Sequence, residues 1–115
     1  MQRKFIYLSE FQKQWKDSGL NDDDLRELEI FLLKNTEAGD MIQGTGGVRK
    51  LRWKTKNSGK RGGLRTLYID FIIHEKIYFL TAYSKKDKID LSSDEKKIIK
   101  SLVDTLLNEL NKKRK

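Results

Sequence analysis

The residues best suited to chemistry in this sequence are cations gathered in one internal segment. No aspartate or glutamate lies between Asp40 and Asp70 of the 115-residue chain. The same window holds eight positive residues: Arg49, Lys50, Arg52, Lys54, Lys56, Lys60, Arg61 and Arg65. The chain has 25 lysines and arginines against 17 acidic residues, a net charge of +8, so these eight account for the whole excess. A fixed positive patch attracts polyanions, which makes nucleic acid the leading class of partner. The alternative is a solvated segment that only promotes solubility.

Two residue counts limit the chemistry further. The chain has no cysteine, which excludes disulfides, thiolate catalysis and cysteine-held metals, and which fits a reducing compartment. The single histidine, His74, excludes a ribonuclease that uses a pair of histidines. Because His74 falls in an expected turn far along the chain from the cations, we assign it no catalytic role.

Length and hydropathy predict a small single-domain protein without a membrane segment. A chain of 115 residues is close to the commonest domain size, so we expect one domain over residues 1–115. No stretch approaches the roughly 20 apolar residues that cross a bilayer. The N-terminal residues lead into a short apolar run rather than a signal-peptide core, so we expect a cytoplasmic protein.

Before the cationic segment, the chain predicts one strand and two helices. Residues 3–8 are rich in aromatic and β-branched side chains and favour a strand. Ser9 and Gln12 have the capping-box spacing of a helix start, and Gly19 predicts its end. Asn21, followed by three aspartates, predicts the N-cap of a second helix that runs to about residue 35 and completes a helical hairpin. Its core-facing positions are Leu25, Leu28, Phe31 and Leu32.

The cationic segment itself predicts a strand followed by a loop. Seven of the eight glycines lie between residues 39 and 63, where flexible connections are expected. From residue 50 the sequence alternates as in a half-buried strand. The outward positions are Lys50, Arg52 and Lys54, and the inward positions are Leu51 and Trp53. Residues 55–63 lack large apolar side chains and indicate a hairpin loop.

The remaining chain predicts a hairpin and a long helix. Residues 64–71 and 77–83 are apolar runs on either side of a turn at 74–76, so they should pair as antiparallel strands. Ser92 and Glu95 have capping-box spacing for the last helix. Its wide apolar stripe consists of Ile98, Ile99, Leu102, Val103, Leu106, Leu107 and Leu110.

These elements predict the fold class. Their order is strand, helix, helix, strand, strand, strand, helix. A sheet this small must cover its apolar faces. We therefore expect an α+β domain in which a small antiparallel sheet is packed by an N-terminal helical hairpin and a C-terminal helix.

Three stretches of the sequence resemble the RelE/HigB family of toxins from bacterial toxin–antitoxin modules. They are GDMIQGTGGVRKLR at residues 39–52, GKRGGLRTLY at residues 59–68 and YSKKD at residues 83–87. The likeness, together with the order of elements, covers nearly the whole chain. The two glycine-rich stretches look closest to the HigB-like branch of the RelE/ParE superfamily.

The resemblance implies a ribosome-dependent endoribonuclease that cuts messenger RNA and blocks translation. The family's reaction uses no metal and no other cofactor: the RNA 2′-hydroxyl attacks the adjacent phosphate and leaves a cyclic phosphate. The implied partners are the ribosome, messenger RNA and a cognate HigA-like antitoxin with a helix-turn-helix DNA-binding part. Operator DNA would be contacted only through the complex with that antitoxin.

The resemblance also implies site residues. Arg65 matches the family's strand arginine that contacts the scissile phosphate, and Lys50 and Arg52 match a basic pair on the preceding strand. Lys86 aligns with a second family arginine at the end of the last sheet strand. Tyr83 is either a group that stacks on a base or donates a proton, or a core aromatic. The expected contacts to RNA phosphates are Lys54, Lys56, Lys60, Arg61 and Lys85.

The identity of the catalytic base stays open at this point. In-line attack at phosphorus needs a base, cations for the developing charge and an acid for the leaving oxygen, and the segment offers mainly cations. Some family members carry a catalytic tyrosine where this chain has Ser92, which we expect to cap a helix. Tyr68 is expected to be a core residue.

Two other functions fit parts of this pattern. A ParE-like relative of the same fold poisons DNA gyrase without nuclease activity, and one fold can host both functions. A non-catalytic nucleic-acid-binding module would also use the positive patch.

Overall fold

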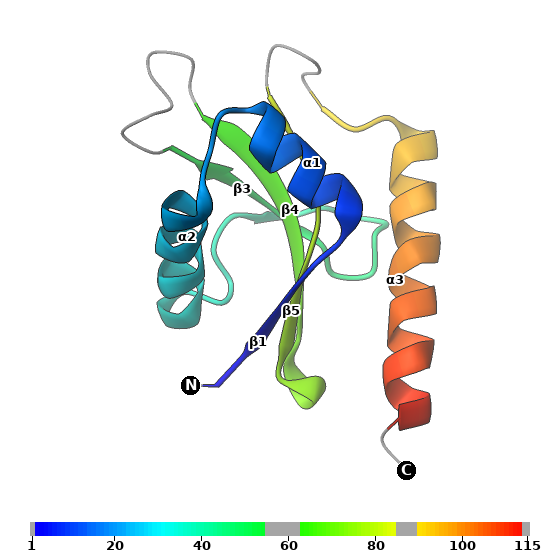
Figure 1. Cartoon of the computed structure of the whole chain (residues 1–115). Coiled ribbons are helices and arrows are strands. Elements are labelled where there is room, and N and C mark those ends of the chain that lie inside the picture. Colours follow the sequence, from blue (N-terminus) through cyan, green and yellow to red (C-terminus); the bar gives the residue numbers. More distant parts are fainter. Residues whose placement is uncertain (1, 55–62, 85–89, 114–115) are drawn as a thin grey trace.

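The computed structural model describes residues 2–54, 63–84 and 90–113, which form a five-stranded sheet packed by helices (Figure 1). The strands are β1 (Lys4–Tyr7), β2 (Asp40–Met41), β3 (Arg49–Trp53), β4 (Leu64–Phe71) and β5 (Lys76–Ser84). The helices are α1 (Ser9–Asp17), α2 (Asp22–Lys34) and α3 (Ser93–Lys113), with a short 3-10 turn, η2 (Ile72–His74). The expected α+β class is confirmed, and the two-residue strand β2 is an addition to the expected order.

The strands run β1-β5-β4-β3-β2 across the sheet. β3, β4 and β5 form the expected antiparallel meander. β1 pairs with β5 in parallel, with Lys4 opposite Lys76, so the expectation of a wholly antiparallel sheet is wrong for this pairing. Parallel neighbours need a long connection, and here all the elements from α1 to β4 lie between the two strands in the chain.

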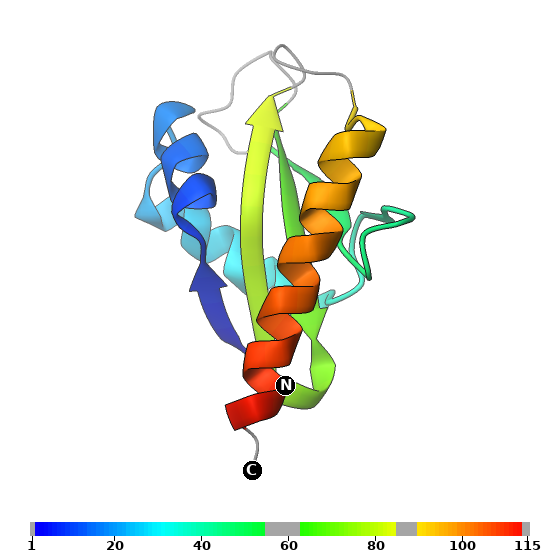
Figure 2. The ribbon, with the colours of Figure 1, turned by 90° about the vertical axis from the view of Figure 1, so that its right-hand side faces the viewer.

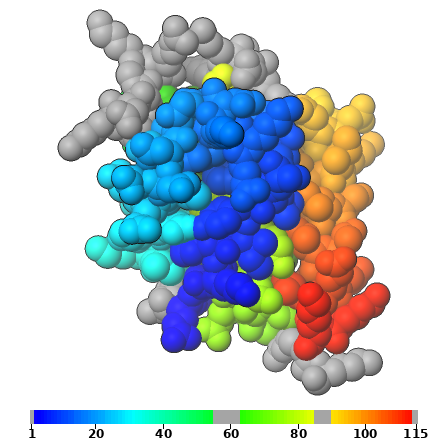
Figure 3. All heavy atoms as spheres, in the orientation of Figure 1, coloured from blue at the N-terminus to red at the C-terminus, as the bar shows by residue number. Residues whose placement is uncertain are grey.

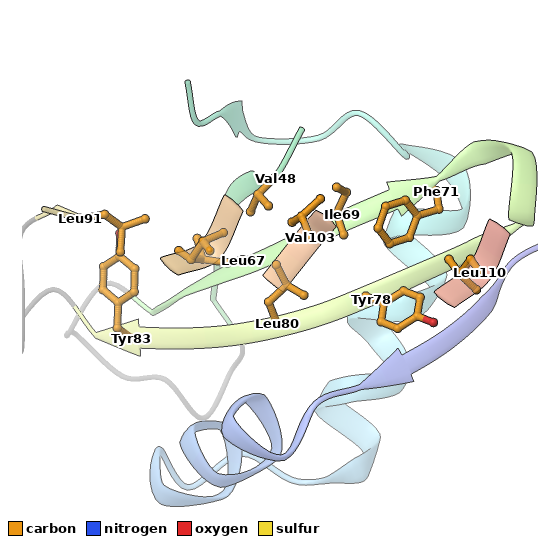
Figure 4. Close-up of a cluster of buried hydrophobic side chains, with 11 residues drawn as sticks. Val48, Leu67, Ile69, Phe71, Tyr78, Leu80, Tyr83, Leu91, Val103 and Leu110 are labelled. Carbon is orange, nitrogen blue, oxygen red and sulfur yellow. The ribbon is translucent and has the colours of Figure 1, made fainter. Parts of the chain in front are cut away.

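Helices cover both faces of the sheet. α1 and α2 lie together on one face and α3 lies on the other, as Figures 1 and 2 show. The space-filling view shows α1 and α2 side by side over their face (Figure 3). Their cluster includes Phe11, Trp15, Leu28, Leu32, Tyr68 and Phe79. The cluster under α3 includes Leu67, Ile69, Leu80, Ile99, Val103 and Leu110 (Figure 4).

The start of α1 differs from the expected capping box. Its N-cap is Leu8, which makes no side-chain cap, and Ser9 is already the first helical residue. The backbone N–H of Leu8 donates to the carbonyl of Phe79 at 3.0 Å, so the chain stays bound to β5 until the helix begins. The predicted end is confirmed, because Gly19 follows the helix at φ +79°.

The other two helix starts follow the sequence signals. The Asn21 side chain accepts from the backbone N–H of Asp24, whose carboxylate accepts from the N–H of Asn21. Ser92 and Glu95 make the same reciprocal pair of hydrogen bonds at the start of α3, at 3.1 and 2.9 Å. These caps use neighbours in sequence, which is why local spacing predicts them.

α3 contacts the sheet along a narrower line than its apolar stripe predicts. Ile99, Val103 and Leu110 are buried, whereas Ile98 is 68% exposed and Leu107 is 36% exposed. The buried line is therefore narrower than the apolar stripe, since one helix presents only part of its circumference to a sheet. None of the described helices is long and apolar enough to cross a membrane.

Candidate functional site

Four of the five predicted catalytic residues lie together on the face of the sheet that α3 covers. Arg52 on β3 is paired with Arg65 on β4, and Arg65 is paired with Tyr83 on β5. Residues paired across strands point to the same side of a sheet. Lys50 lies two residues before Arg52 on the same side, opposite Leu67. We call Lys50, Arg52, Arg65 and Tyr83 the basic site.

Arg65 is half-buried at the start of β4, between Arg52 and Tyr83. Its Nη1 atom is buried and has no hydrogen-bond partner among the residues that the structure describes. A buried donor without an acceptor costs about 1–3 kcal/mol. The guanidinium is therefore suited to bind an anionic oxygen that enters the site.

Lys50 has a carboxylate partner. Its Nζ lies 3.6 Å from Oδ1 of Asp90, which stands just before α3. The Lys50 side chain is 28% exposed and that of Asp90 is 64% exposed, so solvent screens the pair. The backbone N–H of Leu91 and the charge of Lys50 lower the pKa of Asp90. Asp90 is therefore ionised at neutral pH and holds Lys50 toward α3.

Tyr83 is a core residue with its hydroxyl oxygen buried at the basic site. The residue is 5% exposed and packs in the cluster under α3, where Leu91 lies beside it (Figure 4). Burial raises the pKa of the hydroxyl, Asp90 raises it further and Arg65 opposes the rise. The hydroxyl is thus suited to donate a proton rather than to accept one. So little exposed ring area also leaves no face on which a nucleotide base could stack.

Two other hydroxyl groups are committed to the fold. Tyr68 is fully buried, and its hydroxyl lies 2.6 Å from the carbonyl of Ala38 and 3.2 Å from that of Thr36. Burial raises the pKa of Tyr68 to about 12. Ser92 Oγ accepts the N–H of Glu95 in the α3 cap. The expectations that Tyr68 belongs to the core and that Ser92 caps a helix are confirmed.

The remaining predicted cations fall into two groups. Lys54 is exposed immediately after β3. The other predicted residues lie outside the described parts of the chain: Lys56, Lys60, Arg61, Lys85 and Lys86. Arg49, counted within the cationic segment, instead donates to the carbonyls of Glu37 and Gly39 at 2.9 and 3.2 Å. Arg49 therefore ties β3 to the preceding loop.

Asp90 is the site residue that sequence reasoning missed. The available signal was its position two residues before the Ser92 cap, where the chain enters the α3 face. His74 lies in η2, at the end of β4 away from Arg65, with Nε2 3.1 Å from Oδ1 of Asn111. No three His, Cys, Asp or Glu side chains of the described residues gather as metal ligands.

Comparisons with known proteins agree with this fold. The family model described as "RelE toxin of RelE / RelB toxin-antitoxin system" matches residues 3–114. A mutant of the E. coli toxin RelE in the free state superposes with a TM-score of 0.55 at 14% identity, over 77% of this chain and 90% of that chain. The intact E. coli RelBE toxin–antitoxin complex gives a TM-score of 0.52 at 14% identity, over 71% and 95%. At such identities the two structures support the fold.

Proposed function

Because the chain belongs to the RelE family of toxins, we propose that it is the toxin of a toxin–antitoxin module and cleaves messenger RNA on the ribosome. The observation that carries the proposal is the pairing of Arg52 with Arg65, whose buried Nη1 has no partner among the described residues. Preorganised cations of this kind stabilise charge that develops on a reacting phosphate. The likeness to the HigB-like branch stays a prediction.

The proposed reaction is attack by an RNA 2′-hydroxyl on the adjacent phosphorus. Water takes the proton of the 2′-hydroxyl, a bond forms between O2′ and phosphorus, the bond to the 5′ oxygen breaks, and the products are a cyclic phosphate and a 5′-hydroxyl. Arg65 stabilises the negative charge on the phosphate oxygens, and Lys50 and Arg52 on the neighbouring strand β3 hold the RNA. The Tyr83 hydroxyl gives its proton to the leaving 5′ oxygen. Lys86 stays a predicted further cation of this site.

The proposed affinity for the ribosome comes from cations around the basic site. Lys54 is exposed close to Arg52, and the other predicted contacts come later in the chain. Those contacts, Lys56, Lys60, Arg61 and Lys85, stay predictions. Because neutralised phosphates release counterions, binding should weaken steeply as salt is added.

The proposed partner in the resting cell is an antitoxin. The RelE of E. coli forms a complex with its antitoxin. The net charge of +8 favours an antitoxin that brings acidic residues to the basic site. A HigA-like antitoxin with a helix-turn-helix part, contact with operator DNA through the complex, and a cytoplasmic location belong to the same proposal.

The direct test is primer extension on a reporter messenger in a cell-free translation reaction. Wild type is compared with Arg65→Ala and with Arg26→Ala, each with and without ribosomes. Arg26 is exposed on α2, so its replacement removes the same charge away from the basic site. We expect discrete cuts within the translated frame for wild type and Arg26→Ala, only with ribosomes, and their loss in Arg65→Ala.

Intact messenger with the wild type in every lane would refute the nuclease proposal. A supercoiling assay then separates the two alternatives. Inhibition of gyrase by the purified chain would indicate a ParE-like function. Unaffected gyrase, with RNA binding retained, would indicate a non-catalytic binding module.

A further inference from the structure

Asp90 is an acidic residue on a face otherwise built from cations. Its Oδ1 lies 3.6 Å from Nζ of Lys50 and accepts the backbone N–H of Leu91 at 2.8 Å. Leu91 is 8% exposed and packs in the cluster under α3. The carboxylate is therefore held beside β3 by its own backbone, and its contact with Lys50 does not depend on the long lysine side chain alone.

The field of Asp90 reaches the groups of the basic site. It contributes to the raised pKa of Tyr83, while Lys50 and Lys96 help to keep the pKa of Asp90 itself low. Asp94, the second residue of α3, is exposed and makes no ion pair with a described residue. The two carboxylates thus differ in their contact with the basic site and not in their charge.

A carboxylate on a surface that binds a polyanion lowers the affinity of that surface, because like charges repel. Its oxygen is also the same kind of acceptor for an ammonium group as a phosphate oxygen. We propose that in the RNA-free protein the Asp90 carboxylate binds Lys50 in the place where an RNA phosphate would bind. RNA then displaces this carboxylate from Lys50 on binding. This inference rests on the proposed function, because it takes RNA as the ligand of the basic site.

The test compares Asp90→Asn with Asp94→Asn, two nearly isosteric changes that each remove one negative charge. The probe is a single-stranded RNA oligonucleotide with 2′-O-methyl groups throughout, which lacks the attacking hydroxyl and cannot be cut. An exposed ion pair corresponds to about a two- to fivefold change in an equilibrium constant. We expect Asp90→Asn to bind the probe about two- to fivefold more tightly at low salt, with a much smaller gain for Asp94→Asn. Equal gains in the two variants, or no gain for Asp90→Asn, would overturn the proposal.

A double-mutant cycle separates displacement from general repulsion. If Asp90 acts by pairing with Lys50, Asp90→Asn should increase the affinity for the RNA probe less in a Lys50→Met background than in the wild type. The same increase in both backgrounds would show that Asp90 acts only through its distant charge, and would also overturn the proposal. Thermal unfolding of each variant shows whether the protein is folded, and a merely structural role for Asp90 predicts lower stability without tighter binding.

The result stays separable from the proposed function. Because the probe cannot be cut, the affinities are measured whether or not the chain is a nuclease. If the wild-type chain does not cut messenger RNA on the ribosome, the nuclease proposal is refuted, and the effect of Asp90 on RNA binding still stands. If Asp90→Asn does not bind the RNA probe more tightly than the wild type, this inference is refuted, and the nuclease proposal still stands.

Discussion

The two faces of the sheet are covered to different extents, and the difference places the basic site. Two helices seal one face, where Phe11, Leu28 and Phe79 are fully buried. A single helix, α3, covers the other face. A helix is about 10–12 Å across with its side chains, whereas neighbouring strands are about 4.8 Å apart, so one helix cannot cover a five-stranded sheet. Polar residues of β3 and β4 occupy the area that α3 leaves open.

Packing on the sealed face also holds in place a strand that carries part of the basic site. On β5, Phe79 stacks on Tyr7 and Phe11, with ring centroids 5.4 and 4.8 Å apart. Beyond a register shift opposite Leu67 and Tyr68, the same strand presents Tyr83 to the opposite face, beside Arg65. The aromatic packing under α1 thereby fixes a strand that carries part of the site, which is the arrangement that precise positioning of reacting groups requires.

The largest expected effect is on the sealed face. Phe79→Ala removes a fully buried ring, and it should lower the free energy of unfolding by about 3–5 kcal/mol. Chemical denaturation measures this change. A loss below about 1 kcal/mol would mean that the sealed face is loosely packed and would remove the contrast between the two faces.

Arg65→Ala should reduce cleavage rather than stability, in contrast to Phe79→Ala. Loss of the guanidinium should slow ribosome-dependent cleavage by about 10²–10³-fold, as for removal of one preorganised donor. The free energy of unfolding should not fall, because the change also removes a buried Nη1 donor that has no partner among the described residues. Cleavage rates from primer extension, measured beside denaturation curves, test both parts. A destabilised variant with normal cleavage would make Arg65 a structural residue.

Tyr83→Phe separates the packing of the ring from the chemistry of its hydroxyl. The ring should keep its place in the cluster under α3, while removal of the proton donor should slow cleavage by about 10²-fold. The raised pKa of Tyr83 means that wild-type cleavage should show no loss of this donor at or below neutral pH. An unchanged cleavage rate in the variant would assign the proton to another group.

Tyr68→Phe tests the corresponding hydroxyl on the sealed face. It should cost about 1–3 kcal/mol at neutral pH, because the carbonyl of Ala38 loses its donor. The pKa of Tyr68 rises from 10.0 to about 12, so the neutral form is favoured in the folded state. This stability is complete below pH 10 and is lost as pH rises through 12. Denaturation across this range should show the two proteins converging at the alkaline end, with cleavage at neutral pH unaffected.

The smallest effect is expected on the outer side of α3. Ile98 is 68% exposed, so Ile98→Ser should change the free energy of unfolding by less than about 0.5 kcal/mol. Ile99→Ser, one position along and buried, is the matched comparison. Similar large losses in the two variants would show that Ile98 is covered in solution.

Elements that depend on neighbours in sequence could be predicted, and those that depend on distant pairing could not. The caps at Asn21 and Ser92 involve residues three positions apart, so their spacing is visible in the sequence. The start of α1 depends instead on a hydrogen bond from Leu8 to Phe79. The parallel pairing of β1 with β5 has the same origin, because no local pattern specifies which edge a strand joins.

The candidate site likewise has features that the sequence predicts and features that depend on distant pairing. Alternation along β3 predicts that Lys50 and Arg52 share a face, and the structure confirms it. The family resemblance selected Arg65, but its pairing with Arg52 and Tyr83 is set by the register of three strands. Asp90 joins the site through its contact with Lys50, a residue far from it in the chain, which a sequence pattern does not reveal.

The parallel pairing of β1 with β5 also determines when the molecule can assemble. Residues 4–7 are synthesised before the other strands of the sheet, yet their partners are residues 76–79, and Tyr83 follows those partners in the same strand. A nascent chain that has completed β4 still lacks the strand that joins the sheet edge to the basic site. Pairings so distant in sequence slow folding, because a long loop must close before any contact is gained. A growing polypeptide therefore gains the complete basic site only after β5 has been synthesised.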